Sequence, residues 1–330
     1  MISIVMTARD AGATLVEAVQ SCLRQTFRDF ELLLIDNAST DGTRELMAGI
    51  ADPRVRVFAC AGSHVEAHQL GIAESRGDLI ARMDADDVSH PERLARQVEL
   101  MARDRSLSAC VCGVRVRSRG RPVGAGFLAY VDWLNGLLAP EDIARERFVE
   151  SPVVHPAAMV RRDVLGAVGG YQEVEWAEDY DLWLRLLEAG HRVGKVPEIL
   201  FDWYDSDTRL TRTHGRYSQE KFLRAKAHYL ARMPAVQAGG IEICGAGPIG
   251  KRIGRLLIGE GARVSAFYEV NPRRIGETIA GVPVLDQAEL DRSCGPVVLA
   301  AVGLPGARDL VRGLLSGIGF TEGEDFFCVA

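Results

Sequence analysis

The residues best suited to chemistry are the carboxylates in the segment Arg82-Met83-Asp84-Ala85-Asp86-Asp87. This segment follows the apolar run Leu79-Ile80-Ala81 and precedes the residues Ser89-His90-Pro91-Glu92, which predict the start of a helix. Three neighbouring carboxylates repel one another, and a bound cation relieves that repulsion. Hard divalent ions such as Mg²⁺ and Mn²⁺ take oxygen ligands. A bare Asp-x-Asp is more often a solvated acidic turn. The position of the segment in the fold therefore decides between a solvated turn and a cation site.

A second acid, Asp36, follows the apolar segment 30–35 in a similar setting. The first hundred residues alternate segments typical of strands and helices, with strands expected at 2–6, 30–35, 55–58 and 79–83 and helices at 13–25 and 65–75. This alternation predicts an α/β fold, with a parallel sheet covered by helices on both faces. Such sheets bind ligands outside the carboxyl ends of their strands, so one ligand could touch Asp36, Asp84 and Asp86 together.

Length and composition narrow the class of protein. A chain of 330 residues with 47% apolar and 25% charged residues is long enough for two globular domains. A net charge of −6 argues against nonspecific electrostatic binding to nucleic acid. The seven cysteines include no C-x-x-C pair, which favours reduced thiols and a cytoplasmic setting. Cys110 and Cys112 share one face of an expected strand, where core positions are favoured over metal ligation.

The sequence contains no candidate for an integral membrane segment. No run approaches the roughly 18 apolar residues of a spanning helix, and the amino terminus leads directly into a strand without a signal core. The apolar segment 127–139 carries Asp132 and Asn135, so we expect a partly buried loop or helix there. Peripheral contact with the inner face of a membrane stays open.

Several motifs stand in a familiar order along the first 230 or so residues. They are S-I-V-M-T-A-R-D (3–10), L-L-I-D-N-A-S-T-D-G-T (33–43), I-A-R-M-D-A-D-D (80–87), H-P-A-A-M-V-R-R (155–162), V-G-G-Y (168–171) and A-E-D-Y-D-L-W-L-R (177–185). Each motif alone is weak, but the ordered set resembles family-2 glycosyltransferases of the GT-A fold. The resemblance implies an inverting, metal-dependent transfer of a sugar of the hexosyl type from a nucleoside diphosphate donor, with UDP as the family's usual nucleotide, to a hydroxyl.

The same resemblance assigns roles around the metal. Growing negative charge on the leaving diphosphate is stabilised by a divalent ion acting as a Lewis acid. We expect Asp86 to contact that Mg²⁺ or Mn²⁺ ion, and Asp84 to contact the donor ribose or the water molecules of the ion. Asp87 is expected to orient the loop or cap the next helix. For Arg82, pairing with a phosphate and bridging to a neighbouring carboxylate stay equally open.

On the donor side, the resemblance implies that Asp36 hydrogen-bonds the nucleoside, while the backbone of Ala8 and Arg9 lines the base pocket. Relatives usually carry Asn in the helix that leads into the metal strand, where this chain has Gln69. That departure puts one donor-side contact in doubt. The Q-x-x-R-W signature of processive members is absent, which favours addition of a single sugar.

Inversion in one displacement needs a base that takes the proton of the attacking hydroxyl. Glu178 and Asp179 match the acidic pair of the family, and we expect Asp179 to be that base. The alternative for Asp179 is an acid favoured by the dipole of a helix N-terminus. Glu178 stands between acceptor contact and structural support, and His155 is expected to be structural or near the acceptor.

The segment 203–214 places Arg209, Arg212 and His214 among turn-forming residues. One hypothesis is a lid that closes on the diphosphate once donor and metal are bound. The alternative is a surface loop with solvated arginines.

A composition shift at 233–240 predicts a linker and hence two domains, 1–235 and 236–330. After an expected strand at 241–244, the glycines Gly245, Gly247 and Gly250 have G-x-G-x-x-G spacing. Glu269 ends the next expected strand. This pattern predicts a Rossmann-like domain whose glycine turn approaches a pyrophosphate and whose acid receives ribose hydroxyls of NAD or another nucleotide.

The segment 271–285 resembles small nucleotide-binding domains attached to bacterial sugar-modifying enzymes, and we favour a binding, docking or regulatory module. The whole sequence therefore predicts a glycosyltransferase of cell-surface polysaccharide assembly, with a nucleotide-sugar donor and a glycan or lipid-linked glycan acceptor. Two alternatives stay open. One is an NAD-dependent sugar oxidoreductase or epimerase, and the other is a catalytically inactive nucleotide-sugar-binding protein.

Overall fold

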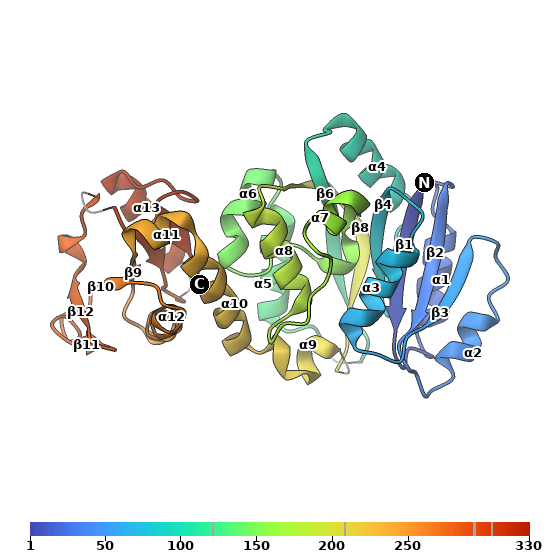
Figure 1. Cartoon of the computed structure of the whole chain (residues 1–330), viewed down its shortest axis with the longest axis horizontal. Coiled ribbons are helices and arrows are strands. Elements are labelled where there is room, and N and C mark those ends of the chain that lie inside the picture. The colour runs from blue at the N-terminus through green and yellow to red at the C-terminus, as the bar shows by residue number, and fades with distance from the viewer. Residues whose placement is uncertain (121, 208, 293–294, 305) are drawn as a thin grey trace. The chain divides into compact units, whose positions relative to one another are not determined.

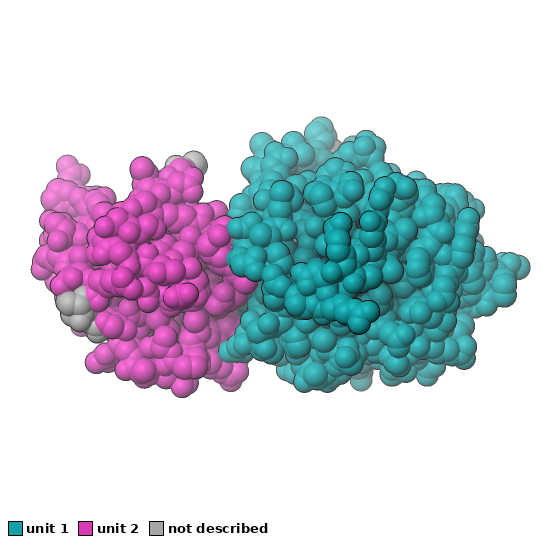
Figure 2. All heavy atoms as spheres, turned by 90° about the horizontal axis from the view of Figure 1, so that it is seen from above, with its two compact units in different colours: residues 1–143, 152–174, 178–213 teal, residues 144–151, 175–177, 214–330 magenta. Residues whose placement is uncertain are grey.

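The structure is a computed structural model that describes residues 1–120, 122–207, 209–292, 295–304 and 306–330. Two compact units are present (Figures 1 and 2). The first unit comprises residues 1–143, 152–174 and 178–213, and the second comprises residues 144–151, 175–177 and 214–330. Within the described residues, no helix combines the length and the apolarity that crossing a bilayer requires.

The first unit is built on an eight-stranded sheet of order β3-β2-β1-β4-β7-β6-β8-β5. Strands β3, β2, β1 and β4 run parallel, and β7 is antiparallel to β4, so the predicted parallel sheet is confirmed for the first hundred residues. Every residue of β1 and β2 is buried, as expected for strands covered on both faces. The strands are β1 (Ile2–Ala8), β2 (Phe30–Asp36), β3 (Val55–Ala59), β4 (Leu79–Asp84), β5 (Val88–Ser89), β6 (Leu107–Ser118), β7 (Met159–Arg161) and β8 (Arg192–Asp205).

Two hydrophobic cores lie on the two faces of this sheet, because successive side chains of a strand point to opposite faces. Ile4 of β1 packs in one core with Leu15, whereas Val5 packs in the other with Val65. The helices between residues 1 and 213 are α1 (Leu15–Leu23), α2 (Thr43–Ala48), α3 (His64–Glu74), α4 (Arg93–Arg103), α5 (Ala125–Gly136), α6 (Pro140–Arg145), α7 (Arg162–Ala167), α8 (Glu178–Glu188), α9 (Leu210–Thr213) and the 3₁₀ turns η2 (His155–Ala157) and η1 (Glu146–Phe148), of which η1 belongs to the second unit.

Two local expectations are met in the first unit. Cys110 and Cys112 are both buried in β6 and belong to a hydrophobic core. The apolar segment 127–139 lies mostly in α5, which buries Val131 and Leu134 and leaves Leu128 exposed.

The second unit contains a six-stranded sheet of order β11-β12-β10-β9-β13-β14. Its first strand in sequence, β9, lies in the middle, and all neighbours except β11 run parallel. The chain places the next strands on one side and the last two on the other, which is the strand order of doubly wound folds. Its elements are η3 (Gly215–Tyr217), α10 (Gln219–Arg232), α11 (Pro234–Gly239), β9 (Ile241–Cys244), α12 (Pro248–Gly259), β10 (Val264–Glu269), β11 (Thr278–Ile279), β12 (Val282–Asp286), η4 (Gln287–Glu289), β13 (Val297–Ala300), α13 (Ala307–Ile318) and β14 (Phe326–Cys328).

The linker predicted at 233–240 is wrong. Pro234 opens α11 at the first helical position, which proline favours, and Gly240 ends it with a φ of 85°. The second unit also begins earlier than the expected boundary after residue 235, because α10 packs against α12.

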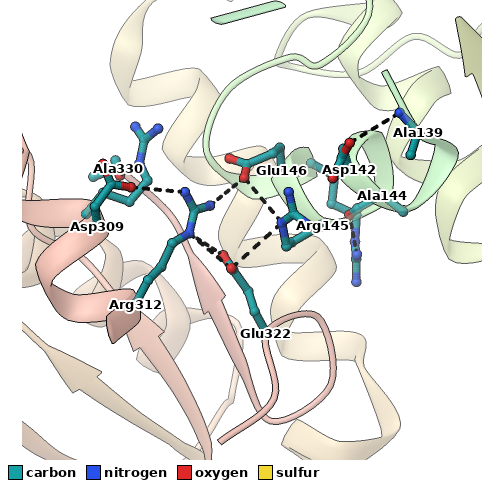
Figure 3. Close-up of polar contacts among 11 residues, drawn as sticks. Ala139, Asp142, Ala144, Arg145, Glu146, Asp309, Arg312, Glu322 and Ala330 are labelled. Atoms are coloured by element: carbon teal, nitrogen blue, oxygen red, sulfur yellow. Dashed lines mark hydrogen bonds and ion pairs between the residues drawn. The ribbon is translucent and has the colours of Figure 1, made fainter. Parts of the chain in front are cut away.

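The second unit takes in a short segment from the middle of the chain, residues 144–151. Figure 3 shows Arg312 of α13 between two carboxylates, with its Nη2 2.5 Å from Glu146 Oε1 and its Nε 2.9 Å from Glu322 Oε1. Arg145 closes the group, with its Nε 3.5 Å from Glu146 and 3.8 Å from Glu322. In addition, the buried Lys226 donates to the carbonyl oxygens of Val149 and Val329. These pairings explain why this segment groups with the second sheet.

Candidate active site at the carboxyl edge of the first sheet

The strand register brings the distant acids to one edge. Ala8 of β1 is paired with Asp36 of β2, and Thr7 is paired with Asp84 of β4. Asp36 and Asp84 therefore flank the end of β1. The chain returns to opposite sides of β1 through β2 and β4, and such a switch in strand order is where open α/β sheets bind ligands.

The turns after β1 and β2 are tied to each other. Asp36 is buried and accepts a hydrogen bond from the backbone N–H of Ser39, while Asp10 accepts from the backbone N–H of Thr40 at 2.7 Å. Asp10 and Ala38 both have positive φ, 51° and 55°, a conformation that costs non-glycine residues about 1–3 kcal/mol. The hydrogen bond from Thr40 to Asp10 holds the turn after β1 and the turn after β2 together at the carboxyl edge of the sheet. Ala8 and Arg9, whose backbone is expected to line the base pocket, lie where β1 ends and its turn begins, and Arg9 is exposed.

Asp84, Asp86 and Asp87 each offer a carboxylate oxygen within 4.8 Å of the others. Burial, and then the charge of Asp84, raise the pKa of Asp86 to about 6. Burial likewise raises the pKa of Asp87 well above its usual range, with the charges of Asp86 and Asp84 adding to the effect. These shifts express an excess of buried negative charge, which a divalent cation with oxygen ligands would relieve. The donor set therefore fits Mg²⁺ or Mn²⁺.

Asp87 has a different environment from the other two acids. One of its oxygens accepts the backbone N–H of Tyr204 at 2.7 Å, which ties the acidic loop to β8. Its other oxygen is buried without a hydrogen-bond partner in the described structure. Asp87 is thus placed to orient the loop, as expected, and its second oxygen adds to the unbalanced charge.

Arg82 is buried, and protein groups occupy all three of its nitrogen atoms. It donates to Asp84 Oδ1 at 3.0 Å, to the carbonyl oxygen of Val5 at 2.7 Å and to His155 Nε2 at 3.1 Å. Of the two roles that the sequence leaves open, these contacts favour the carboxylate bridge. Because arginine can only donate, His155 Nε2 must be the acceptor, and it also accepts the hydroxyl of Tyr171 at 2.6 Å. This chain of contacts fixes the orientation of Asp84.

Asp179 stands in the first turn of α8, where its Oδ1 accepts the backbone N–H of Tyr180 at 2.7 Å. Burial, and then the charge of Glu178, raise the pKa of Asp179 to about 7. The charge of Asp84 adds to this effect, so Asp179 lies within electrostatic reach of the acidic cluster. A carboxylate whose pKa is near neutrality is matched to general base work.

The three residues of the expected lid have separate environments. Arg209 lies 4.7 Å above the ring of Trp203, and its charge lowers the pKa values of Asp86 and Asp87. Arg212 instead forms a close ion pair with Asp205 at the end of β8. His214 belongs to the second unit, where its Nδ1 accepts the backbone N–H of Arg216. Of these three residues, Arg209 is therefore the one whose charge acts on the acidic cluster.

Sequence reasoning missed three residues near these acids. Arg119 donates to the carbonyl oxygen of Asp86 at 3.4 Å and to Glu17 at 2.7 Å, although nothing in the sequence marks it. His64 and His68 lie beside Glu178. His64 directly precedes the expected helix 65–75 and belongs to α3 in the structure, so the four-residue spacing of the two histidines was a usable signal, because residues four apart share a helix face.

In the second unit, the glycine turn is closely packed. A Cβ atom on Gly250 would lie 1.8 Å from the carbonyl oxygen of Gly245, whereas for one on Gly247 the nearest described atom beyond its chain neighbours is Arg274 Nη1, at 3.9 Å. The expected ribose acid, Glu269, already accepts two backbone N–H groups and pairs with Arg274 at 3.1 Å. The turn is open to a ligand at Gly247, but the carboxylate of Glu269 is engaged.

Comparisons with known proteins give a consistent result. Residues 3–169 match the family model described as glycosyl transferase family 2. The putative glycosyltransferase EpsE of Bacillus subtilis is 30% identical over 225 residues, which cover 66% of this chain and 77% of EpsE. The O-antigen biosynthesis glycosyltransferase WbnJ of Escherichia coli is 27% identical over 229 residues, which cover 68% of this chain and 84% of WbnJ.

Two solved structures are similar in fold. TarS 1-349 of S. aureus, in complex with UDP-GlcNAc, has a TM-score of 0.57 at 14% identity, over 78% of this chain and 71% of that chain. The mannosyltransferase PcManGT of Pyrobaculum calidifontis, in complex with GDP-Man and Mn²⁺, has a TM-score of 0.50 at 17% identity, over 70% of this chain and 62% of that chain. At such identities the likeness shows a shared architecture.

Proposed function

Because the chain belongs to glycosyltransferase family 2, we propose that its GT-A unit transfers a sugar from a nucleoside diphosphate to a hydroxyl, with inversion at the anomeric carbon. The proposal is supported by the strand register, which puts Asp36 and Asp84 on either side of the end of β1, and by the charge of Asp84, which helps to raise the pKa of Asp179. TarS binds UDP-GlcNAc and PcManGT binds GDP-Man with Mn²⁺, which supports a nucleotide-sugar donor, with UDP as our first choice. The names of WbnJ and of an amylovoran biosynthesis relative support a glycan or lipid-linked glycan acceptor in cell-surface polysaccharide assembly.

On the donor side, Asp86 and Asp84 would hold a Mg²⁺ or Mn²⁺ ion. When bound, that ion supplies Lewis-acid stabilisation of the charge that grows on the leaving diphosphate. Arg82 keeps Asp84 in one orientation, so the carboxylate is set in place before the donor arrives. Asp36 would hydrogen-bond the nucleoside, and the Ala8-Arg9 backbone would line the base pocket. Arg209, already near the acids, would offset part of the charge of the diphosphate.

On the acceptor side, Asp179 would take the proton of the acceptor hydroxyl as the hydroxyl oxygen attacks the anomeric carbon. Burial, and then the charges of Glu178 and Asp84, keep the pKa of Asp179 high enough for it to accept a proton near neutral pH. Glu178 would support the helix turn that carries Asp179.

For the second unit, we propose a nucleotide-binding, docking or regulatory role, with NAD or another nucleotide at the glycine turn. The open space at Gly247 and the doubly wound strand order support it. An NAD-dependent oxidoreductase or epimerase, and an inactive binding protein, are the rival functions.

The test is a panel of nucleotide sugars, with product detection in the presence of Mn²⁺ or of EDTA. We expect transfer that EDTA abolishes and that Asp86→Asn lowers severely. Asp78→Asn is the matched control, since Asp78 precedes the opposite end of β4 and is highly exposed. Transfer that persists in EDTA would contradict the metal role. Reduction of bound NAD without any transfer would favour the oxidoreductase.

A further inference from the structure

A second group of possible metal-ligand atoms includes Glu178 and lies outside the Asp84–Asp87 cluster. His64 and His68 stand four residues apart on α3, and their Nε2 atoms are 2.9 Å from each other. His64 Nε2 is also 3.5 Å from Glu178 Oε1 on α8. One ligand atom from each of these three residues lies within 4.8 Å of the other two. Two imidazole nitrogens and one carboxylate oxygen therefore converge from two helices.

Tight local packing holds this group in place. Helix α3 begins with a capping box between Ser63 and Glu66, which fixes its first turn. Further along α3, a Cβ atom on Gly71 would lie 2.3 Å from Val5 Cγ1, so the helix approaches β1 as closely as glycine allows. The ring of His68 stacks on Tyr171 at 4.5 Å. The ligand atoms are thus positioned without a bound ion.

The electrostatics of the group favour a cation. Burial, and then the charge of Arg82, lower the pKa of His68 well below its usual range, so His68 is a neutral donor that adds no positive charge. Glu178 is 2% exposed, and it stands next to Asp179, whose pKa its charge helps to raise. The buried carboxylate thus lies beside the imidazole of His64 and next in sequence to a second carboxylate, that of Asp179. An ion between them would offset that charge and would separate the two facing nitrogens.

We propose that His64, His68 and Glu178 bind a transition-metal ion of the zinc class, at a site separate from the Asp84–Asp87 cluster. Imidazole nitrogen suits zinc, whereas Mg²⁺ and Mn²⁺ prefer sites made of oxygen alone. Zinc–nitrogen bonds of about 2.0–2.1 Å in a tetrahedral site place two ligand atoms about 3.3 Å apart. The observed separations of 2.9 and 3.5 Å lie on either side of that value. His64 is 32% exposed, which leaves a side open for entry and for a water ligand.

The ion would have a consequence for the transfer reaction, and this consequence rests on the proposed function. Glu178 is the first residue of α8 and Asp179 is the second. An ion that holds Glu178 to α3 would restrict the turn that carries Asp179. His64 and His68 would then be positioning residues for the base.

The test measures binding directly on the full chain after removal of metals with a chelator. Co²⁺ serves as the probe, because a four-coordinate site with nitrogen ligands absorbs visible light far more strongly than a six-coordinate oxygen site. We expect the wild-type protein to show this intense absorption and Zn²⁺ to displace it. His64→Asn should weaken binding at least about 10-fold, since loss even of an outer-shell partner costs about 10–100-fold in metal affinity.

Two control variants make the result specific. His90→Asn removes a histidine of similar exposure, 30%, that is not part of the group, and Asp86→Asn alters the acidic cluster. Both should keep the intense absorption, and circular dichroism checks that each variant is folded. Equal spectra for wild type and folded His64→Asn, or loss of the spectrum in Asp86→Asn alone, would overturn the proposal. Absence of sugar transfer with the cobalt spectrum intact would refute only the proposed function.

Discussion

Replacing Asp179 with Asn should make the protein inactive and more stable at the same time. The wild-type carboxylate is held among the charges of Glu178 and Asp84, where burial makes its ionised form costly. Asn has nearly the same shape and carries no charge, so the cost disappears together with the base. A residue that served only as a helix N-terminal acid would give the opposite result, because its removal would cost stability.

The size of the effect follows from the pKa of Asp179. A rise from 3.8 to about 7 corresponds to about 4 kcal/mol, at about 1.36 kcal/mol per pKa unit. The side chain keeps partial access to solvent and Glu178 shares the repulsion, so we expect about 1–2 kcal/mol of added stability at pH 8. For transfer, loss of a general base should lower kcat about 10²–10⁴-fold.

The pH dependence provides the sign. Between about pH 4 and 7 the unfolded chain has lost this proton while the folded wild-type protein still holds it, so wild-type stability falls as pH rises through this range. The advantage of Asp179→Asn should therefore be absent near pH 4 and complete above pH 7. Thermal unfolding of both proteins in EDTA measures the difference in stability between them. Both proteins contain the same histidines, so the titration of these histidines contributes equally to both stabilities and drops out of the difference.

Asp163→Asn is the matched control for this experiment. Asp163 lies in the first turn of α7 and likewise accepts the N–H of the next residue, but it is exposed. Its replacement should leave transfer unchanged and give no gain in stability. If Asp179→Asn kept full transfer, or melted below wild type at pH 8 in EDTA, the reasoning about this carboxylate would be refuted.

Three further changes test other parts of the structure. Tyr171→Phe removes a hydroxyl that donates to His155, so unfolding should cost about 1 kcal/mol less, measured by urea titration, and Asp84 should bind Mn²⁺ more weakly. Gly250→Ala places a Cβ 1.8 Å from a backbone oxygen, so the second unit should unfold at lower temperature. Hydrogen exchange of the amides in β9 and β10 measures this unfolding. Arg312→Met leaves the buried Glu146 without its closest cation, and unfolding should be easier by about 3–5 kcal/mol at pH 8, with partial recovery in Arg312→Lys. Unchanged denaturation curves would contradict each of these expectations.

The sequence predicted elements best where a mainly apolar run indicated a strand. The strands expected at 30–35 and 79–83 each end one residue later in the structure, at Asp36 and Asp84. The expected helix 65–75 is α3, displaced by one residue. The linker expected at 233–240 failed because small residues read as flexible, whereas Pro234 at the first position of a helix is a start signal.

Side-chain partners were harder to predict, because they depend on elements that lie far apart in the sequence. Arg82 had two equally open roles until the positions of Asp84 and His155 were known. Arg209 and Arg212 are near neighbours with similar local sequence, yet one reaches the acidic cluster and the other pairs with Asp205. Such choices follow from the packing of β8 on the acidic loop, which no local pattern encodes.

The discontinuity of the second unit constrains the order in which the protein can be completed during synthesis. Glu146 leaves the ribosome long before Arg312, which stands 166 residues later. Until that arginine is made, Glu146 has Arg145 beside it but lacks Arg312, the closer of its two native cations. The segment 144–151 therefore cannot complete its native contacts until α13 has been made. A truncation before α13 would disturb this segment, far upstream of the missing residues.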